Sequence, residues 1–326
     1  MRIWWIAVLG IVARAQDLPV PTIKVPVRLV TAPTLVFSEN DRLVFGLESG
    51  DFQVYDNGHT QKATVDTELP RLSVVLAVEA NQDVRAYTRF IARVGSAADA
   101  LLVGERGEGA LLQYGEEVKV LKAFDDSGDV QSALRKLSGA GRKARAVDAG
   151  MRAIALLKDR PARRNRVLIF VGQPVDSGSE SKLATLREEA EQNNVAVFAL
   201  ALPVAGKDFV SDTFSLDGLS SRTDRGGFKA GVDLGRLVPT LRRTSAVAEG
   251  GDPFSVLTAA TGGTQYHFRA QRELEDGISL IGVELRSEYL VSYSPAPGGP
   301  GYHTIRVEVG MPGAKVFSRP GYWMTR

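Results

Sequence analysis

The chain has 326 residues, of which 44% are hydrophobic and 24% are charged, the composition of a globular protein with a sizeable core. Its 40 basic and 38 acidic residues nearly balance, which argues against a nucleic-acid-binding surface, because such a surface normally shows as a basic excess. Cysteine is absent from the sequence, and this excludes disulfides, thiol catalysis and cysteine-ligated metal sites.

The N-terminus has the pattern of a secretory signal peptide. Arg2 supplies a positive charge, residues 3–12 form an apolar run, and residues 13–15 (Ala-Arg-Ala) fit a small-x-small cleavage site. Ten helical residues rise only about 15 Å, half of a bilayer's hydrocarbon core, so we expect cleavage before Gln16 rather than a membrane anchor. A buried N-terminal strand is the alternative. No other stretch is long enough for a membrane span, so the sequence predicts a secreted, periplasmic or cell-envelope protein.

The next segment is predicted to be β-structure. Apolar and polar residues alternate over 24–29, the pattern of a half-buried strand, and short apolar runs at 43–45 and 52–55 predict further strands. Asn57-Gly58 predicts a hairpin with a type I′ turn, because both residues accept a positive φ. These few strands cannot bury a face alone and therefore need a partner sheet.

Strands and helices alternate from residue 71 to residue 202. Nearly uninterrupted apolar runs, typical of parallel strands covered on both faces, occur at 72–78, 167–171 and 195–202. Apolar residues at three- and four-residue spacing predict helices at 83–94, 130–137, 147–154 and 183–190. A strand pair at 109–114 and 118–123 flanks Gly115. This order predicts an α/β fold with a doubly wound, mostly parallel sheet and right-handed crossovers.

The C-terminal part returns to β-structure after two helices. Pro253 begins a helix that we expect Gly262-Gly263 to end by taking left-handed conformations, and a second helix covers about 271–286. Strands are predicted at 289–293, 303–309 and 315–318. They are the natural partners of the N-terminal strands in a small β-sandwich.

The predicted organisation has four parts. A signal peptide covers residues 1–15, and residues 16–68 form the first half of the sandwich. The α/β domain covers 69–287 and contains an insertion at 203–250 that is rich in Gly, Ser, Asp and Arg. Residues 288–326 complete the sandwich.

This arrangement resembles the von Willebrand factor type A fold, which is Rossmann-like, and more narrowly the exported bacterial proteins known as VWFA-related. In that group an opening β segment has the pattern G-L-x-x-x-D-F-x-V-x-x-D-G, which is similar to residues 46–58. A Thr-Gly-Gly turn, a Y-x-x-x-Y strand and a terminal R-x-G-Y are matched at 261–263, 289–293 and 319–322. Each motif is weak by itself, but their joint order is fairly specific and extends over nearly the whole mature chain.

The resemblance also implies a metal-ion-dependent adhesion site at the carboxyl end of the first buried strand. Type A domains commonly place D-x-S-x-S there, and its oxygens hold Mg²⁺, a hard ion that prefers octahedral oxygen ligands. In this chain the first three ligand positions are occupied by Glu79, Asn81 and Asp83. All three carry oxygens, but Glu79 is one methylene longer than the aspartate it replaces.

Two later loops of the family supply a threonine and an aspartate to the same site. The first loop aligns on Asp148 and puts Ala144 in the place of the threonine, and alanine cannot ligate a metal. In the second, Gln173 replaces the aspartate, although Asp176 lies nearby. We therefore interpret the site as degenerate and without a cofactor, with Mg²⁺ or a looser Ca²⁺ site through Glu79, Asp83 and Asp176 as the alternatives. The simpler interpretation is that these side chains cap helices and loops, with Asp83 as the N-cap of the following helix.

The sequence shows no catalytic constellation. His59, His267 and His303 are not at ligand spacing and have no obvious partner in the sequence. The leading hypothesis is therefore an exported, non-enzymatic adhesion-type scaffold that binds a protein partner. The alternatives are an assembly protein that acts through its β-sandwich and a hydrolase with a site in the insertion. The predicted binding residues are Glu79, Asn81, Asp83, Asp148, Gln173 and Asp176.

Overall fold

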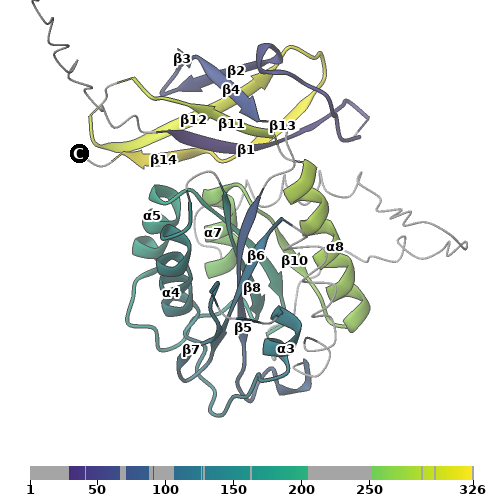
Figure 1. Ribbon diagram of the computed structural model, residues 1–326, viewed down its shortest axis with the longest axis vertical. Helices are drawn as coiled ribbons and strands as arrows, with labels where there is room; N and C mark the ends of the chain where they lie inside the picture. Colours follow the sequence, from purple (N-terminus) through teal and green to yellow (C-terminus); the bar gives the residue numbers. More distant parts are fainter. Residues whose placement is uncertain are drawn as a thin grey trace, which may run out of the picture.

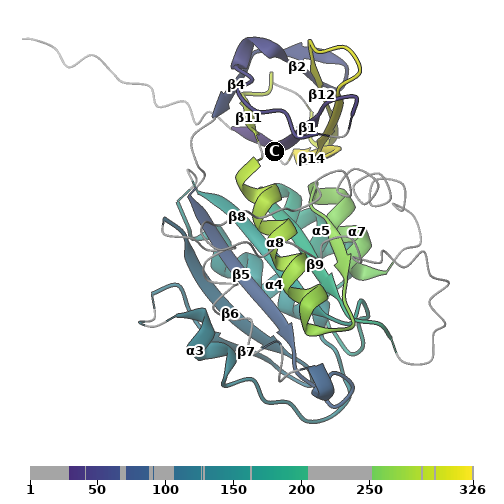
Figure 2. The same ribbon diagram turned by 90° about the vertical axis from the view of Figure 1, so that its right-hand side faces the viewer.

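The structure, a computed structural model, describes residues 29–40, 42–66, 71–87, 91, 106–125, 127, 129–161, 164–204, 252–287, 289–296 and 299–324. They form a sheet flanked by helices and, at one end of that sheet, a small β-sandwich (Figures 1 and 2). No described helix has the length and apolar character needed to cross a membrane.

The central sheet has six strands in the order β10-β9-β8-β5-β6-β7. All neighbours are parallel except the edge pair β6 and β7, which is antiparallel. The strands are β5 (Leu72–Glu79), β6 (Glu108–Tyr114), β7 (Val118–Lys122), β8 (Asn165–Gly172), β9 (Val195–Ala201) and β10 (Gln265–His267). Every residue of β5 and β9 is buried, as expected for parallel strands covered on both faces. The doubly wound prediction is therefore confirmed, whereas β10 was not predicted.

Helices cover both faces of this sheet (Figures 1 and 2). On one face lie α4 (Ala146–Lys158), α5 (Leu183–Gln192) and α7 (Pro253–Thr261), and on the other lie α3 (Val130–Leu134) and α8 (Gln271–Ser287). Residues 85–87 and 91 are helical as predicted, and the rest of the predicted helix after position 87 lies outside the described residues.

Both ends of α7 agree with the sequence-based prediction, except for the conformation of Gly263. The side chain of Asp252 accepts hydrogen bonds from Phe254 N and Ser255 N ahead of Pro253, and Gly262 ends the helix with a left-handed φ of 83°. Gly263 does not have a positive φ, contrary to our expectation. It is needed for close approach instead, because a Cβ there would lie 2.1 Å from the carbonyl oxygen of Val197.

The sandwich consists of two four-stranded antiparallel sheets, ordered β13-β1-β11-β4 and β14-β12-β2-β3. Strands of the N-terminal segment are β1 (Val30–Phe37), β2 (Phe52–Asp56), β3 (His59–Gln61) and β4 (Ala63–Asp66). The C-terminal segment supplies β11 (Tyr289–Tyr293), β12 (Gly301–Val309), β13 (Lys315–Ser318) and β14 (Gly321–Met324). Each sheet contains two strands from the N-terminal segment and two from the C-terminal segment, which confirms the predicted sandwich with the α/β fold inserted in it.

In this part the strand prediction at 43–45 was wrong, the one at 24–29 lies almost entirely outside the described residues, and the hairpin was right. The first described strand begins at Val30; Leu29 precedes it and is 52% exposed, and residues 24–28 lie outside the described residues. Residues 43–45 form no strand, because Leu43 makes only an isolated bridge to Phe37. The β2–β3 turn has positive φ at both central residues, 47° at Asn57 and 82° at Gly58, as the type I′ turn requires.

The motifs that suggested the family converge on a buried polar cluster inside the sandwich. One carboxylate oxygen of Asp56 accepts hydrogen bonds from the hydroxyls of Tyr293, at 3.0 Å, and Tyr322, at 2.7 Å. The other lies 2.8 Å from His303 Nδ1. Asp56 is 5% exposed, so this one side chain satisfies polar groups from three strands away from water.

Two predicted segments lie outside the described residues. The signal peptide at 1–15 and nearly all of the 203–250 insertion belong to this group, since only residues 203 and 204 of the insertion are described. The domain boundaries proposed above remain predictions.

We predict that Asp56→Ala lowers the free energy of unfolding by about 3 kcal/mol or more, because it leaves buried donors without an acceptor. Urea unfolding measures this. Asp51→Ala, which removes an exposed carboxylate from the same sandwich, should cost less than about 1 kcal/mol. Equal losses in the two variants would show that the buried cluster contributes little.

Candidate functional site

The candidate site lies where β5 and β8 end side by side. In chain order the strands run 3-2-1-4-5-6 across the sheet, so the order reverses between β5 and β8, and doubly wound folds bind ligands at the carboxyl ends next to this reversal. The starts of β8 and β9 face the sandwich, where Asn165 and Ala196 lie against Thr31 and Pro33. The carboxyl ends are therefore at the opposite pole of the sheet.

Glu79, the last residue of β5, is 1% exposed and is held by two hydrogen bonds. Asn81 Nδ2 donates to one carboxylate oxygen at 2.7 Å, and the backbone N–H of Gln173 donates to the other at 2.5 Å. Burial raises the pKa of Glu79 to about 7. The two hydrogen bonds act in the opposite direction and lower this pKa, while the charge of Asp83 raises it further. Both carboxylate oxygens are thus already engaged within the protein.

Asn81 serves the backbone around it. Its Oδ1 accepts from the N–H groups of Asp83, at 3.0 Å, and Val84, at 3.2 Å, while its Nδ2 also donates to the carbonyl of Lys143 at 3.1 Å. Asn81 therefore caps the helical turn that follows. This corrects our expectation that Asp83 is the cap.

The side chain of Asp83 is more exposed than those of Glu79 and Asn81. Its side chain is 37% exposed, and its carboxylate is 3.7 Å from a guanidinium nitrogen of Arg142. An exposed ion pair at this distance contributes little to stability.

Asp148 and Asp176 come together, but they cap α4 and its neighbouring loop. Asp176 accepts from Val147 N at 2.9 Å, and Ser179 Oγ accepts from Asp148 N at 3.2 Å. The carboxylate of Asp148 in turn accepts from the backbone N–H groups of Glu180 and Ser181. Because Arg145 at the N-cap of α4 makes no side-chain cap, the loop satisfies the free N–H groups of this helix.

Ala144 and Gln173 complete the set of family positions. The methyl group of Ala144 is buried, and its backbone pairs with Ser177 in an isolated bridge. The side-chain amide of Gln173 donates to the carbonyl of Pro203 at 3.1 Å.

Tyr114, at the end of β6, also lies at the site but was not among the residues predicted for it. Its hydroxyl is fully buried and has no hydrogen-bond partner among the described residues, and burial raises its pKa well above 10, as do the charges of Glu79 and Asp176. Gly172 makes this arrangement possible, because a Cβ there would lie 2.5 Å from the Tyr114 hydroxyl. In the sequence, Tyr114 looks like any apolar strand residue.

These residues do not fit an octahedral metal centre. The oxygens of Glu79, Asn81 and Asp176 accept backbone or amide hydrogen bonds, Ala144 has no side-chain ligand atom, and the exposed carboxylate of Asp83 is paired with Arg142. Mg²⁺ needs near-ideal geometry and dehydrates reluctantly, so it would have to break several of these bonds. Within the described ranges, no group of three or more His, Asp or Glu side chains is placed to hold a metal ion.

The histidines are also dispersed. His59 lies in β3, His267 in β10 and His303 in the sandwich cluster around Asp56. They therefore form no shared site.

Around the site lies a loop with a run of basic residues. Arg142 and Lys143 are 78% and 53% exposed in their side chains, and their backbone N–H groups donate to Glu116. Arg145 N donates to the carbonyl of Gly115 at 3.4 Å. Beside this loop is a shallow depression of about 180 Å³, lined by Ala80, Gln113, Gly115, Glu116, Glu117, Lys119, Ser138, Gly139 and Ala140. The Arg-Lys-Ala-Arg run at 142–145 is the sequence signal that could have identified this surface.

The strand order of the described sheet, with one antiparallel edge pair, matches the doubly wound, von Willebrand factor type A-like sheet that the sequence predicted. No family model and no curated protein matches the chain. Similar solved structures include a von Willebrand factor type A protein from Catenulispora acidiphila, with 9% identity over 91% of this chain and 74% of that chain and a TM-score of 0.45.

Two further structures are similar at the same level. The conserved hypothetical protein BatB from Bacteroides thetaiotaomicron has 14% identity over 64% of this chain and 98% of that chain, with a TM-score of 0.38. Proximal thread matrix protein 1 from the mussel byssus has 8% identity over 72% and 50%, with a TM-score of 0.47. Likeness at this level says nothing about site residues or ligands, and the narrower resemblance to the exported VWFA-related group remains a prediction.

We predict that the chelator-treated protein binds Mg²⁺, Ca²⁺ and Mn²⁺ no more tightly than about millimolar, because the ligand atoms are already hydrogen-bonded. Calorimetric titration and thermal melts measure this. Asp83→Ala should behave like the wild type in both. A submillimolar dissociation constant, with a melting temperature that rises with metal concentration, would show instead that the loops rearrange to form a centre.

Proposed function

We propose that this protein is a non-enzymatic binding scaffold that recognises a protein partner, without a bridging metal, through the loops at the carboxyl ends of its sheet. The observation that carries the proposal is that the 142–145 loop combines a fixed backbone with exposed basic side chains. Its backbone is pinned by neighbouring loops, while the side chains of Arg142 and Lys143 are exposed and make long ion pairs.

The pinning comes from several directions. Glu116 accepts from two backbone N–H groups of the loop, Asn81 donates to the carbonyl of Lys143, and Ser177 Oγ accepts from Ala144 N at 2.9 Å. A surface fixed in this way loses little conformational entropy when a partner binds.

The side chains of Arg142 and Lys143 are, by contrast, exposed and only loosely paired. The distances from Arg142 to Asp83 and from Lys143 to Glu116 are both 3.7 Å. Exposed pairs of this length are weak, so charged groups of a partner can replace them. The mixed charges of this surface favour a protein partner over a nucleic acid.

We predict that Arg142→Glu/Lys143→Glu weakens capture of a protein partner by the immobilised chain roughly tenfold or more, in buffer containing EDTA. Quantified capture from a cell-surface extract measures this. The matched control is Arg152→Glu/Lys158→Glu, which reverses two exposed charges on α4 and should capture like the wild type.

Either of two results would contradict the proposal. Equal capture by both variants would point to the sandwich, as the assembly alternative requires. Loss of wild-type capture in EDTA would point to a metal bridge.

We also propose that the protein is exported. The support is the charged start, the ten-residue apolar run and the small residues at 13 and 15. We predict that the mature protein begins at Gln16, which N-terminal sequencing of the protein from its native cell would check. A mature chain that retains residues 1–15 would exclude cleavage at this position.

A further inference from the structure

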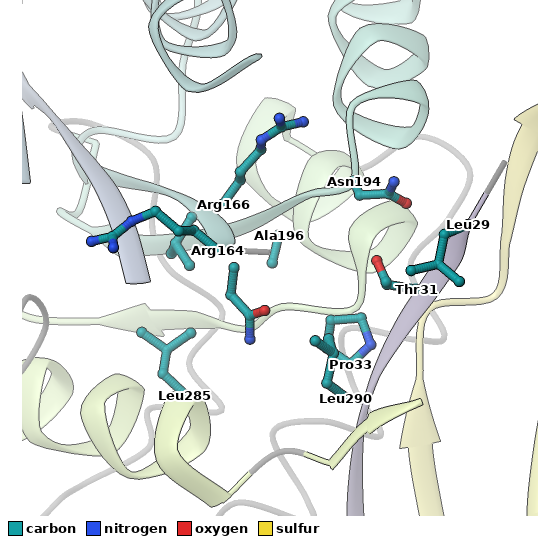
Figure 3. Close-up of a pocket in the computed structure, with 11 residues that line it drawn as sticks. Leu29, Thr31, Pro33, Arg164, Arg166, Asn194, Ala196, Leu285 and Leu290 are labelled. Atoms are coloured by element: carbon teal, nitrogen blue, oxygen red, sulfur yellow. The ribbon is translucent and has the colours of Figure 1, made fainter. Parts of the chain in front are cut away.

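The seam between the sandwich and the α/β part contains both a cavity and a buried arginine, Arg319. The cavity measures about 90 Å³ (Figure 3). Pro33 and Leu290 from the sandwich and Ala196 and Leu285 from the α/β part lie on its walls (Figure 3). The seam is therefore not closed by apolar packing alone.

Arg319, between β13 and β14, joins the two parts through polar contacts. It is 3% exposed, and its guanidinium donates to Asn194 Oδ1 at 2.9 Å and to the backbone carbonyls of Thr31 and Glu191, both at 3.3 Å. Its Nε donates to the carbonyl of Gly321 at 2.8 Å. This arginine thus ties the end of α5 and the turn before β9 to strands of the sandwich.

The side chain of Glu191 lies in the same seam, at the end of α5 that packs against β14. It is 3% exposed, and its Oε2 has no hydrogen-bond partner among the described residues. Oε1 lies 3.8 Å from Arg187 Nε, beyond hydrogen-bond reach. A carboxylate buried in this way is poorly compensated when ionised.

We propose that this seam is a pH-sensitive joint, which protonation of Glu191 holds closed and which loosens as the pH rises through neutrality. The groups that face Glu191 are Arg187 and Glu188 on its own helix, Arg319 between β13 and β14, and Tyr302 on β12. Burial outweighs the two arginines and raises the pKa of Glu191 to about 7, with a smaller contribution from Glu188.

The direction follows from linkage between proton binding and closure. When the seam opens, the carboxyl returns to water and its pKa falls toward the ordinary value of 4.5. The closed seam therefore binds the proton more tightly. Its extra stability is complete below about pH 4.5 and is lost as the pH rises through about 7. A pKa difference of this size changes the ratio of closed to open seam by at most about 300-fold.

The test is hydrogen exchange of the full chain between pH 5.5 and pH 8, with rates corrected for the intrinsic effect of pH. We expect protection of the β14 amides to fall by at least about tenfold across this range in the wild type. In Glu191→Gln the protection should stay constant. Glu180→Gln makes the same substitution at an exposed carboxylate at the other pole and should follow the wild type.

A second pair of variants tests the mechanism even if Glu191→Gln fails to fold. Arg187→Gln removes a charge that lowers the pKa of Glu191, so the midpoint of the loss of protection should move to higher pH. Glu188→Gln removes a charge that raises this pKa, so the midpoint should move to lower pH. A flat profile in the wild type, an unchanged profile in Glu191→Gln, or midpoint shifts in the same direction would each overturn the proposal.

Discussion

The interleaving of the two chain ends is the constraint on which the rest of this structure depends. Strand β1 pairs with β11 on one side and β13 on the other, so both of its neighbours in the sheet come from the C-terminal segment. The α/β part therefore lies, along the chain, between strands that pair with each other in the sandwich. Arg319 then fixes the angle between the two parts, because its donors reach α5, the turn before β9 and β1 together.

The polar residues at the two poles of the sheet differ in how well they are satisfied. At the carboxyl ends, side-chain oxygens of Asn81, Asp148 and Asp176 accept hydrogen bonds from backbone N–H groups. These bonds hold the loops in place and leave few oxygen lone pairs available to a metal ion. At the amino ends, Glu191 is buried with one oxygen unpaired. The first arrangement suits recognition by a fixed surface, and the second suits a joint whose closure depends on conditions.

The sequence predicted what local patterns determine. Continuous apolar runs identified the buried strands, Asn57-Gly58 identified the hairpin, and Pro253 identified a helix start. Strand β10 was missed because three residues, two of them polar, carry no period. The N-cap was assigned to Asp83 instead of Asn81, and the role of Asp176 was left open, because a cap depends on which N–H groups the fold brings near the side chain. Nothing local distinguishes Glu191 from Glu188, since its burial comes from strands more than a hundred residues further along the chain.

The two poles are connected through β8 and β9, which begin at the seam and end at the loops. Every residue of β9 and the last six of β8 are buried, and close-packed strands of this kind do not slide by small steps. A seam that loosens around Glu191 would therefore release the sandwich without moving Gln173 or Asp176, unless the sheet itself shifted. The fold thus allows the orientation of the sandwich to respond to pH while the shape of the recognition surface stays fixed.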